Sequence, residues 1–548
     1  MNSKLLFFAS IVTLLSFNAF SQIEWINSTG GDEWDCAYQI AIDETGNSYV
    51  IGHFNSTVDL DPGPIDNTVS TEGQRDILVQ KFDPFGNLIW AKTIGSNDSE
   101  EAKSIVIGNS GNIYITGDFQ ATLDFDPGIG ISDLTPQGIT DVFVWKIDSA
   151  GNHIWAKSFT GGSSYNGGSI AADSDENIYV TGYFFDSTDF DPGPANFYLA
   201  SNGSGDIFIE KMDSSGNFIW AKAIGSTYYD QGYGIEVDEA NNVYVSGRFR
   251  GTVDFDPSAL GIYNLIAPSS QDAFTVKLNE DGDFIWAESS AAGISDVLHS
   301  IVTDGSGNLY SCGSFDPGSF PDIPDMYIEK RDTSGTILWS LFFGAGAYDQ
   351  CVSLAIDDQD NIYITGSYGE TVDFESGPES TLLTSTASND IFVLKIDPFG
   401  NMHWAKTTAS NTSVNIGQSI VIGPDGSIFL TGQYRGTTNF DFGGNNHALT
   451  SMGDADIFVL KMSAQSGLAE NEEPQNVLIY PNPATETLNI LTTEVLTEIS
   501  IFDIHGKMVL TFSRNLAYID ISGLESGIYF VQTSSENGTI VQQKLVVN

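Results

Sequence analysis

Short apolar segments separated by turn residues are the main pattern along this chain. Between residues 102 and 161, for example, four apolar stretches are divided by Gly-, Asn- and Asp-rich breaks. Stretches of this length with such breaks are typical of β-strands joined by turns. We name the four predicted strands of this unit a (103–107), b (112–119), c (141–147) and d (153–159).

Strands b and c are apolar at successive positions, which predicts that both of their faces are buried between neighbouring sheets. No segment of the mature chain shows a helical period of apolar residues. The pattern therefore predicts an all-β protein built from four-stranded antiparallel units.

The same unit recurs along the chain with a period near 65 residues. Its first marker is a tryptophan in strand d, with spacings of 65, 65, 65, 66, 53 and 65: Trp25, Trp90, Trp155, Trp220, Trp286, Trp339 and Trp404. A strand-c lysine repeats in step: Lys81, Lys146, Lys211, Lys277, Lys330, Lys395 and Lys461. A four-stranded unit repeated seven times predicts a seven-bladed β-propeller over residues 22–463.

The two ends of this repeat region are complementary. The strand Ile23–Asn27 has the d-type tryptophan but no preceding a, b or c, and the last unit ends at Lys461 without a strand d. We therefore expect residues 23–27 to complete the last blade and close the ring, which would remove the open sheet edges.

The repeats also resemble the bacterial seven-bladed β-propeller repeat family. The resemblance rests on turns such as Asp43-Glu44-Thr45-Gly46-Asn47 followed by Tyr49-Val50-Ile51-Gly52, and it covers about residues 22–463. The family implies a scaffold and does not by itself imply a chemistry.

The N-terminus has the features of an export signal. Lys4 precedes the apolar run 5–17, and Ala19-Phe20-Ser21 offers small residues for cleavage before Gln22, so residues 1–21 are predicted to be a signal peptide. No later apolar run reaches about 18 residues, the length expected of a membrane-spanning helix. We therefore expect no transmembrane segment in the mature protein.

The C-terminal part departs from the repeat. Residues 464–475 are a polar linker, and 476–548 predict a small antiparallel, immunoglobulin-like β-sandwich. This part resembles the type A C-terminal sorting domain of the Bacteroidetes type IX (Por) secretion system, on the motifs Tyr480-Pro481-Asn482-Pro483, Leu488, Ile490, Ile501-Phe502-Asp503, Gly506-Lys507, Ile519-Asp520-Ile521-Ser522, Leu524 and Gly527-Ile528-Tyr529-Phe530-Val531. The resemblance implies that the tail engages the type IX machinery and that the protein is released or attached to the outer-membrane surface.

The charge balance excludes one class of partner. The 548 residues include 72 acidic and only 21 basic ones, for a net charge of −51. Nucleic-acid binding requires clustered Lys and Arg, so it is not expected. The three cysteines, Cys36, Cys312 and Cys351, are interpreted as buried small residues, with a Cys312–Cys351 disulfide as the alternative.

A recurrent D-x-D motif in the b–c connection is the candidate metal site. Two carboxylates one residue apart on an extended strand project to the same side and could supply oxygens to Ca²⁺. Asp-Pro-Gly is also a strong turn former, and we therefore interpret the motif as a structural turn with no cofactor, with calcium binding as the alternative. The paired aspartates are Asp59 with Asp61, Asp124 with Asp126, Asp189 with Asp191, and Asp254 with Asp256.

The d–a loops carry the candidate ligand-binding residues. Aromatic rings there could stack on sugars or cover a protein partner, whereas the adjacent acid could instead cap a tight loop. The residues are Trp34, Asp35, Tyr165, Tyr229, Asp230, Tyr348 and Asp349.

Catalytic motifs are missing from the sequence. It has no H-E-x-x-H, no G-x-S-x-G and no P-loop, and the six histidines fall at unrelated repeat positions. We therefore expect a secreted or surface-attached, non-enzymatic propeller that binds a protein or a glycan. The alternatives are a polysaccharide hydrolase or lyase on the same scaffold, and a structural, calcium-stabilised surface protein.

Overall fold

A computed structural model describes most of the chain. The described residues are 23–63, 67–161, 165–268, 270–290, 293, 295–316, 324–375, 380–412, 415–442, 447–463, 477–480, 484, 487–492, 496–503, 507–512, 518–524, 527–535 and 540–547. They fall into two compact units, which we call the ring unit (23–463) and the tail unit (477–547). The predicted signal peptide (1–21), its cleavage before Gln22 and the predicted linker (464–475) lie outside the described residues.

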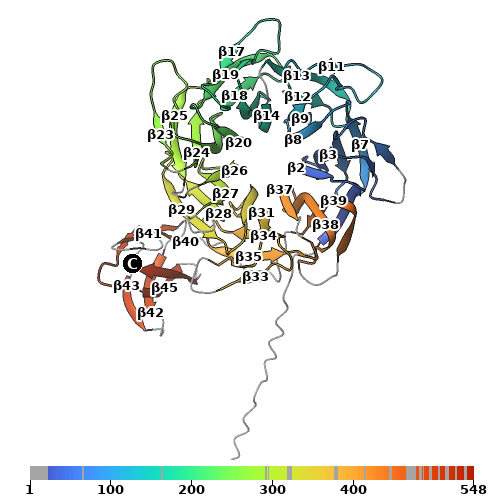
Figure 1. Cartoon of the computed structure of the whole chain (residues 1–548). Coiled ribbons are helices and arrows are strands. Elements are labelled where there is room, and N and C mark those ends of the chain that lie inside the picture. Colours follow the sequence, from blue (N-terminus) through green and yellow to red (C-terminus); the bar gives the residue numbers. More distant parts are fainter. Residues whose placement is uncertain are drawn as a thin grey trace, which may run out of the picture. The chain divides into compact units, whose positions relative to one another are not determined.

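The described part of the ring unit contains seven groups of four antiparallel strands, which we number as sheets 1 to 7 in the order of their inner strands. The inner strands, of type a, are β2 (Cys36–Ile42), β8 (Glu100–Ile107), β14 (Tyr165–Ala172), β20 (Gln231–Val237), β26 (Val297–Thr303), β30 (Gln350–Ile356) and β37 (Ile416–Ile422). Each inner strand packs beside the next one, and β37 returns to β2, so the sheets are arranged around a centre (Figure 1).

The other three strands of each sheet follow outward in the order b, c, d. The b strands are β3 (Ser48–Phe54), β9 (Ile113–Phe119), β15 (Ile178–Phe184), β21 (Val243–Phe249), β27 (Leu309–Phe315), β31 (Ile362–Tyr368) and β38 (Ile428–Asn439). The c strands are β6 (Asp76–Phe82), β12 (Asp141–Ile147), β18 (Asp206–Met212), β24 (Asp272–Leu278), β28 (Asp325–Arg331), β34 (Asp390–Ile396) and β39 (Ala448–Met462). The d strands are β7 (Leu88–Ile94), β13 (His153–Gly161), β19 (Phe218–Ile224), β25 (Phe284–Ser290), β29 (Ile337–Phe343), β35 (Met402–Thr407) and β1 (Ile23–Gly31).

The first described strand pairs with the last strand of the ring unit. β1 runs antiparallel to β39, with Trp25 opposite Lys461 and Thr29 opposite Ile457. Ile23 is buried in the same apolar cluster as Leu430, Leu460 and Met462. The sheet formed by β37, β38 and β39 therefore receives its outer strand from the other end of the chain.

The core lies between neighbouring sheets. In β3 and β6 all seven residues are buried, as predicted for strands covered on both faces. Residues of adjacent sheets share each apolar cluster; Ile51 of β3 and Ile105 of β8 are in one such cluster. The described residues contain strands and no helix, so the prediction of an all-β protein with propeller repeats is confirmed.

The repeated lysine and tryptophan are structural. Lys81 Nζ lies 4.7 Å from the Tyr49 ring centroid and 3.9 Å from Asp43, and it donates to the carbonyl oxygen of Ser149 in the next sheet. The indole of Trp90 donates to the same carbonyl oxygen, at 3.2 Å. Each repeat is thus tied to its neighbour, which explains why these side chains recur. The cysteines Cys36, Cys312 and Cys351 are buried free thiols.

Short hairpins extend the b–c connections of five sheets and an extra strand, β36 (Ala409–Ser410), pairs with β38. The hairpins are β4 (Thr57–Asp59) with β5 (Thr68–Ser70), β10 (Leu123–Asp124) with β11 (Asp133–Leu134), β16 (Ser187–Asp189) with β17 (Tyr198–Ala200), β22 (Thr252–Asp254) with β23 (Asn264–Ile266), and β32 (Thr371–Asp373) with β33 (Leu382–Thr384).

The tail unit consists of two antiparallel sheets. One contains β40 (Val477–Tyr480), β41 (Thr487–Thr492) and β44 (Tyr518–Asp520); the other contains β42 (Leu496–Asp503), β43 (Met508–Phe512), β45 (Gly527–Ser535) and β46 (Ile540–Val547). Leu488 and Ile519 of the first sheet share a buried cluster with Ile499, Ile501 and Val531 of the second. The immunoglobulin-like assignment stays a prediction.

Candidate functional site at the inner strands

Every inner strand of the ring unit carries a β-bulge at the same repeat position. In β2, for example, Ala37 pairs with Gly52 and Gln39 with Ile51, so that Tyr38 is left without a partner on β3. The seven bulge residues are Tyr38, Lys103, Gly168, Tyr233, His299, Val352 and Gln418. Bulges re-aim side chains and are common beside functional sites.

A glycine on strand b accompanies the bulge. A Cβ atom at Gly52 would collide with the carbonyl oxygen of Cys36, and one at Gly117 with that of Glu101. The glycine at this position of strand b, which ends segments such as Tyr49-Val50-Ile51-Gly52, is therefore required by the close approach of the bulged strand. Although this glycine and the other markers repeat, the bulge residue itself changes from sheet to sheet. The repeat symmetry is broken at this position.

The bulge residues lie near one end of the ring unit. Because successive strands of a sheet run in opposite directions, the b–c and d–a connections gather at one end. We call this end the loop face. Each bulge lies on an inner strand only a few residues after a d–a loop, as Tyr38 follows Asp35. The bulge residues are therefore grouped where the inner strands meet the loop face, which we call the inner edge of the loop face.

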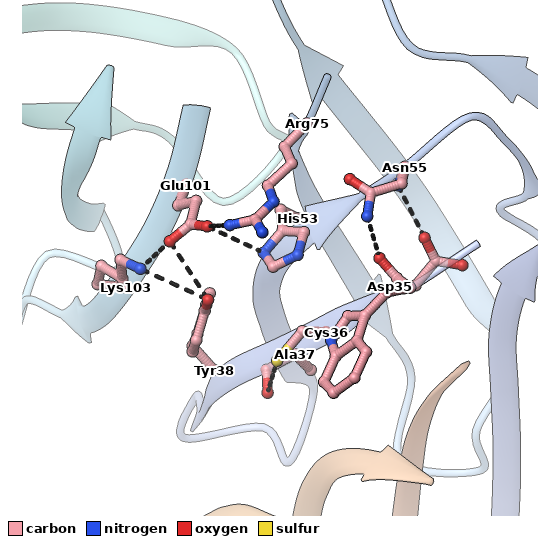
Figure 2. A network of polar contacts seen from close by, with 10 residues as sticks. Asp35, Cys36, Ala37, Tyr38, His53, Asn55, Arg75, Glu101 and Lys103 are labelled. Atoms are coloured by element: carbon pink, nitrogen blue, oxygen red, sulfur yellow. Dashed lines mark hydrogen bonds and ion pairs between the residues drawn. The ribbon is translucent and has the colours of Figure 1, made fainter. Parts of the chain in front are cut away.

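One group of polar side chains joins sheets 1 and 2 at this edge (Figure 2). We define the first polar cluster as Tyr38, His53, Arg75, Glu101 and Lys103. Glu101 forms ion pairs with Arg75 and Lys103 and accepts a hydrogen bond from the Tyr38 hydroxyl at 3.3 Å. Lys103 Nζ also lies 4.4 Å from the centroid of the Tyr38 ring. One carboxylate thus compensates two cations.

His53 is a neutral member of this cluster. It is 2% exposed, and neither ring nitrogen has a hydrogen-bond partner. Burial, together with the nearby Arg75 and Lys103 cations, lowers the pKa of His53 to about 3. Its Nδ1 lies 3.9 Å from Glu101, but at neutral pH this contact is not an ion pair. The first polar cluster is therefore internally compensated, with Arg75 as its most exposed charged group.

A second group lies across sheets 3, 4 and 5. We define the second polar cluster as Tyr183, Tyr229, Tyr233, Arg248 and His299. The ring centroids of Tyr183 and Tyr229 are 5.1 Å apart, and those of Tyr233 and His299 are 5.6 Å apart. The guanidinium carbon of Arg248 lies 5.8 Å from the Tyr233 ring, and its charge acts on Tyr229, Tyr233 and His299.

Arg248 differs from the arginines that have carboxylate partners. Its Nε donates to Gln231 Oε1 at 2.7 Å, and Tyr233 Oη donates to the same oxygen at 2.6 Å. Arg250 likewise donates to an amide, that of Gln271, at 3.1 Å. By contrast Arg75, Arg331 and Arg435 form ion pairs with Glu101, Glu329 and Asp454. Within the described part of the chain, Arg248 and Arg250 form no ion pair.

The acids predicted in the d–a loops hold these loops together. Asp35 accepts backbone N–H groups of Gly31 and Asn55, both at 2.8 Å. Asp230 accepts the backbone N–H groups of Ser226 and Arg250. Asp349 accepts those of Ala345 and Gly369. All three carboxylates are fully buried. Burial raises the pKa of Asp35 to about 7 and that of Asp349 to about 6, and it also raises the pKa of Asp230.

The predicted aromatic residues are in different surroundings. Tyr229 is part of the second polar cluster, and Tyr348 is 50% exposed and close enough to affect the pKa of Tyr233. Trp34 is partly exposed, and its carbonyl oxygen accepts a hydrogen bond from the Asn55 side chain. Tyr165 is the first residue of β14, and its side chain lies outside the described part. The structure thus places Tyr229 in the second polar cluster and Tyr348 within electrostatic range of Tyr233.

The D-x-D motifs form turns. Asp124 Oδ1 accepts the backbone N–H groups of Asp126 at 3.0 Å and Ser132 at 2.7 Å. Asp126 Oδ1 accepts that of Gly128 at 2.8 Å. Both carboxylates of the pair are therefore acceptors for the backbone of their own loop.

The other three pairs lie in turns of the same kind. Asp61 Oδ1 accepts the backbone N–H of Gly63 at 2.7 Å. Asp191 Oδ1 accepts that of Gly193 at 2.7 Å, and Asp256 Oδ1 accepts that of Ser258 at 3.0 Å. The first acid of each pair accepts the N–H of the second acid, at 3.1, 3.2 and 3.1 Å; these first acids are Asp59, Asp189 and Asp254.

Calcium binding by these motifs stays a prediction. Among the described residues, no group of three or more His, Cys, Asp or Glu side chains is placed to hold a metal ion. The turns bring backbone N–H groups to one oxygen, Oδ1, of each acid in a pair, so a cation would have to share that oxygen or use Oδ2. In all eight predicted ligands Oδ1 accepts a backbone N–H group of the same loop; these residues are Asp59, Asp61, Asp124, Asp126, Asp189, Asp191, Asp254 and Asp256.

Sequence reasoning missed Tyr38, Lys103, Tyr233, Arg248 and His299. A signal was present, because the bulge position varies among the repeats, whereas the next position is Ser in five of the seven. The sequence held a second signal for Arg248. Most other basic residues of the repeats are either the strand-c lysine or a lysine two residues after the strand-d tryptophan, and Arg248 is at neither position.

Comparisons with known proteins agree with this architecture. Residues 478–548 match the family model of the secretion system C-terminal sorting domain, and residues 154–183 and 338–367 match the β-propeller repeat model. The chain is a β-propeller repeat protein with a type IX sorting domain. This sorting domain makes it a secreted or cell-surface protein. The described residues include no helix with the length and hydropathy of a membrane span.

Curated relatives match only parts of this propeller protein. An uncharacterized WD repeat-containing protein of Acanthamoeba polyphaga mimivirus is 26% identical over 39% of the chain and 19% of its own length. Regulatory protein FlaEY of Caulobacter vibrioides is 24% identical over 40% of the chain and 23% of its own length. Beta-agarase D of Zobellia galactanivorans is 29% identical over 14% of the chain and 16% of its own length. The chain thus spans about a fifth of the length of these relatives.

Solved structures resemble the chain only distantly. Polysaccharide lyase Uly1 is 10% identical, with a TM-score of 0.38, over 80% of this chain and 90% of that one. A glucose dehydrogenase is 10% identical, with a TM-score of 0.32, over 80% of this chain and all of that one. At such scores these likenesses support no conclusion about activity.

Proposed function

We propose that this secreted propeller protein is a binding protein whose loop face takes an extracellular ligand, a protein or a glycan. The observation that carries the proposal is the ring of bulge residues. Six of the seven bulge residues have side chains, and these include two tyrosines, a lysine, a histidine and a glutamine. A purely structural position would be expected to repeat as the tryptophans and lysines do.

The two polar clusters add a physical reason. Aromatic and guanidinium groups at the inner edge of the loop face offer contact area and directional hydrogen bonds, the side-chain types that dominate binding energy. The buried d–a carboxylates hold the loops around them in a fixed shape, which lowers the entropic cost of binding. The calcium-stabilised structural alternative lacks comparable support, because one oxygen of each D-x-D carboxylate already accepts a turn N–H group and no cluster of three or more potential metal ligands is found among the described residues.

A binding screen tests the proposal. The purified protein is applied to arrays of polysaccharides and of extracellular proteins, in parallel with the double variant Tyr38→Ala, Tyr233→Ala. We expect at least one ligand bound by the wild type and lost in the variant. A variant changed at the opposite end of the ring unit, Ser110→Ala, is the matched control and should bind like the wild type. If the wild type binds nothing, or the control loses binding equally, the proposal is wrong.

The absence of enzymatic activity is also part of the proposal. The first polar cluster contains a tyrosine, a neutral histidine and an arginine, which are groups that could serve in polysaccharide cleavage. In this cluster, however, Arg75 is compensated by Glu101, and His53 is 2% exposed. We therefore expect any bound polysaccharide to be recovered at its original length after incubation, as measured by size-exclusion chromatography. Shortened chains would favour the enzymatic alternative.

A further inference from the structure

The uncompensated arginine of the second polar cluster indicates the kind of ligand. Although the chain has 72 acidic and only 21 basic residues, Arg248 and Arg250 form no ion pair in the described part, and Arg248 is the one that lies in the second polar cluster. Arg248 uses its Nε for Gln231, and its two Nη groups donate to no described residue. Two parallel N–H donors in a plane fit the oxygens of a carboxylate or a sulfate. An anionic group is therefore the partner that Arg248 lacks.

The first polar cluster provides the contrast. Arg75 and Lys103 already share Glu101, so an incoming anion would meet a carboxylate at that point. Arg248 meets only the neutral amide of Gln231, and burial together with Arg248 lowers the pKa of His299 to about 4, so that this imidazole is also uncharged at neutral pH. Among these charged groups, Arg248 is the one left for an external anion.

The aromatic residues beside Arg248 indicate what carries the anion. Tyr183, Phe185 and Tyr229 form a cluster with centroid distances of 5.1, 5.7 and 5.8 Å. All three are partly exposed, and Tyr228 next to them is 57% exposed. Ring faces pack against apolar faces of ligands, while the tyrosine hydroxyls and the Gln231 amide can form hydrogen bonds. A pyranose ring has an apolar face and a rim of hydroxyl groups that match both features.

We infer that the second polar cluster binds an acidic saccharide, with the carboxylate or sulfate on Arg248 and the sugar ring against Tyr229 and its aromatic neighbours. This inference rests on the proposed binding function and specifies its ligand class. Because the overall charge of −51 repels polyanions, binding depends on this local cation.

The repeat provides a matched pair of variants. Gln433 in β38 occupies the position equivalent to Arg248, so Arg248→Gln introduces a side chain that the same fold already holds there. Arg435 occupies the position equivalent to Arg250: its backbone N–H bonds to Asn415 as that of Arg250 bonds to Asp230. Since Arg435 is ion-paired with Asp454, Arg435→Gln removes the same charge at the same end of the ring without touching the second polar cluster.

Affinity electrophoresis tests the inference with the full-length secreted protein. The gels contain polygalacturonate as a carboxylated polymer, dextran sulfate as a sulfated polymer, or dextran as a neutral one. We expect the wild type to be retarded by one or both acidic polymers and not by dextran. Arg248→Gln should weaken binding about tenfold or more, Tyr229→Ala should weaken it as well, and Arg435→Gln should leave it unchanged. Which acidic polymer retards the protein distinguishes a carboxylate from a sulfate.

Several outcomes would overturn the inference. The inference is wrong if neither acidic polymer retards the wild type. It is also wrong if Arg248→Gln and Arg435→Gln lose retardation equally, because equal loss indicates non-specific attraction to charge. Each variant is checked by its melting temperature, and if Arg248→Gln is unfolded, Arg248→Lys replaces it, since a lysine keeps the charge but loses the planar pair of donors. If the array screen finds a neutral glycan or a protein ligand instead, the binding function stands and the acidic-saccharide inference falls.

Discussion

Trp25 lies opposite Lys461 in the antiparallel pair of β1 and β39, although 436 positions separate them in the sequence. The Trp25 indole also donates to the carbonyl oxygen of Pro84 in the next sheet, at 3.0 Å. The start of the described chain is therefore held on both sides, by its own sheet and by a neighbour.

Deletion of Ile23–Asn27 should destabilise the ring unit. The deletion exposes the outer edge of β39 and removes the buried Ile23, worth roughly 1.5–3 kcal/mol, together with the partly buried Trp25 and Ile26. We expect a lower melting temperature and soluble aggregates, measured by calorimetry and light scattering. A deletion of five residues within 464–475 serves as the control. Unchanged melting and a monodisperse sample after the β1 deletion would contradict this prediction.

Stability should rise on mild acidification. Burial raises the pKa of Asp35 and Glu100 to about 7 and that of Asp296 and Asp349 to about 6, whereas the unfolded values are near 4. The buried His53 and His299, whose pKa values are lowered, act in the opposite direction, but the carboxyls with raised pKa values outnumber them. The folded state therefore binds more protons between about pH 4 and pH 7, and the free energy of unfolding increases as the pH falls through this window. Urea denaturation at pH 8.0 and pH 5.5 should give a higher midpoint at pH 5.5. A lower midpoint there would show the prediction to be wrong.

Asp35→Asn should weaken this pH dependence. Sheet 7 already has an amide at the equivalent position: Asn415 Oδ1 accepts the Arg435 N–H, and its Nδ2 donates to Ser410 and Thr412. The variant should fold and be at least as stable as the wild type at pH 8. Because it lacks one titrating carboxyl, the slope of its unfolding free energy against pH should be smaller by up to about 1.4 kcal/mol per pH unit. The measurement is the slope of unfolding free energy against pH; an unchanged slope would count against the assigned shift of Asp35.

The D-x-D motif should respond to hydrogen-bond loss and not to metal removal. Asp124→Ala leaves two loop N–H groups without their acceptor and should cost about 1–3 kcal/mol. Asp124→Asn should cost less, because an amide oxygen can accept the same bonds, as Asn439 does from Asp441. A chelator should leave the melting temperature unchanged. A fall that calcium restores and magnesium does not would establish a calcium site.

The charge of Arg248 should be detectable at His299. A nearby cation disfavours the imidazolium, so Arg248→Gln should raise the His299 pKa from about 4. The value should stay below 6.5, because burial is the larger cause and remains. NMR titration of the histidine resonances measures the shift, with His299→Asn for assignment and Arg435→Gln as the control. No change in Arg248→Gln would mean that the two side chains do not interact in solution.

Removal of the tail should block export but not folding. The tail unit has its own core, and its match to the sorting domain covers residues 478–548. In a bacterium with a type IX system, a chain truncated after Ser463 should remain in the periplasm with the melting temperature of the intact ring unit. Fractionation and limited proteolysis provide the measurement. Truncated protein on the surface or in the medium would contradict the role of the tail.

The sequence by itself determined the local and periodic features. Alternating apolar and turn residues predict the strands, and the in-step tryptophan and lysine markers predict the repeated sheets, because each repeat needs the same contacts with its neighbour. The order of strands at the two ends predicts that Ile23–Asn27 belongs beside the last unit, where β1 lies. The motifs from Tyr480 to Val531 predict the sorting domain without reference to the ring.

Only the tertiary structure decided which side chains meet at the inner strands. Tyr183, Tyr229, Tyr233, Arg248 and His299 come from three sheets and have no common spacing, because their proximity depends on how the sheets are arranged around the ring. The sequence does not show whether the d–a acids bind a ligand or cap a loop; these acids are Asp35, Asp230 and Asp349. Each is buried and accepts a backbone N–H group 20 residues further on, and this contact forms only because strand b ends beside the d–a loop in the folded structure. Likewise, only the structure shows that Arg248 forms no ion pair among the described residues, and the inferred anion site depends on this.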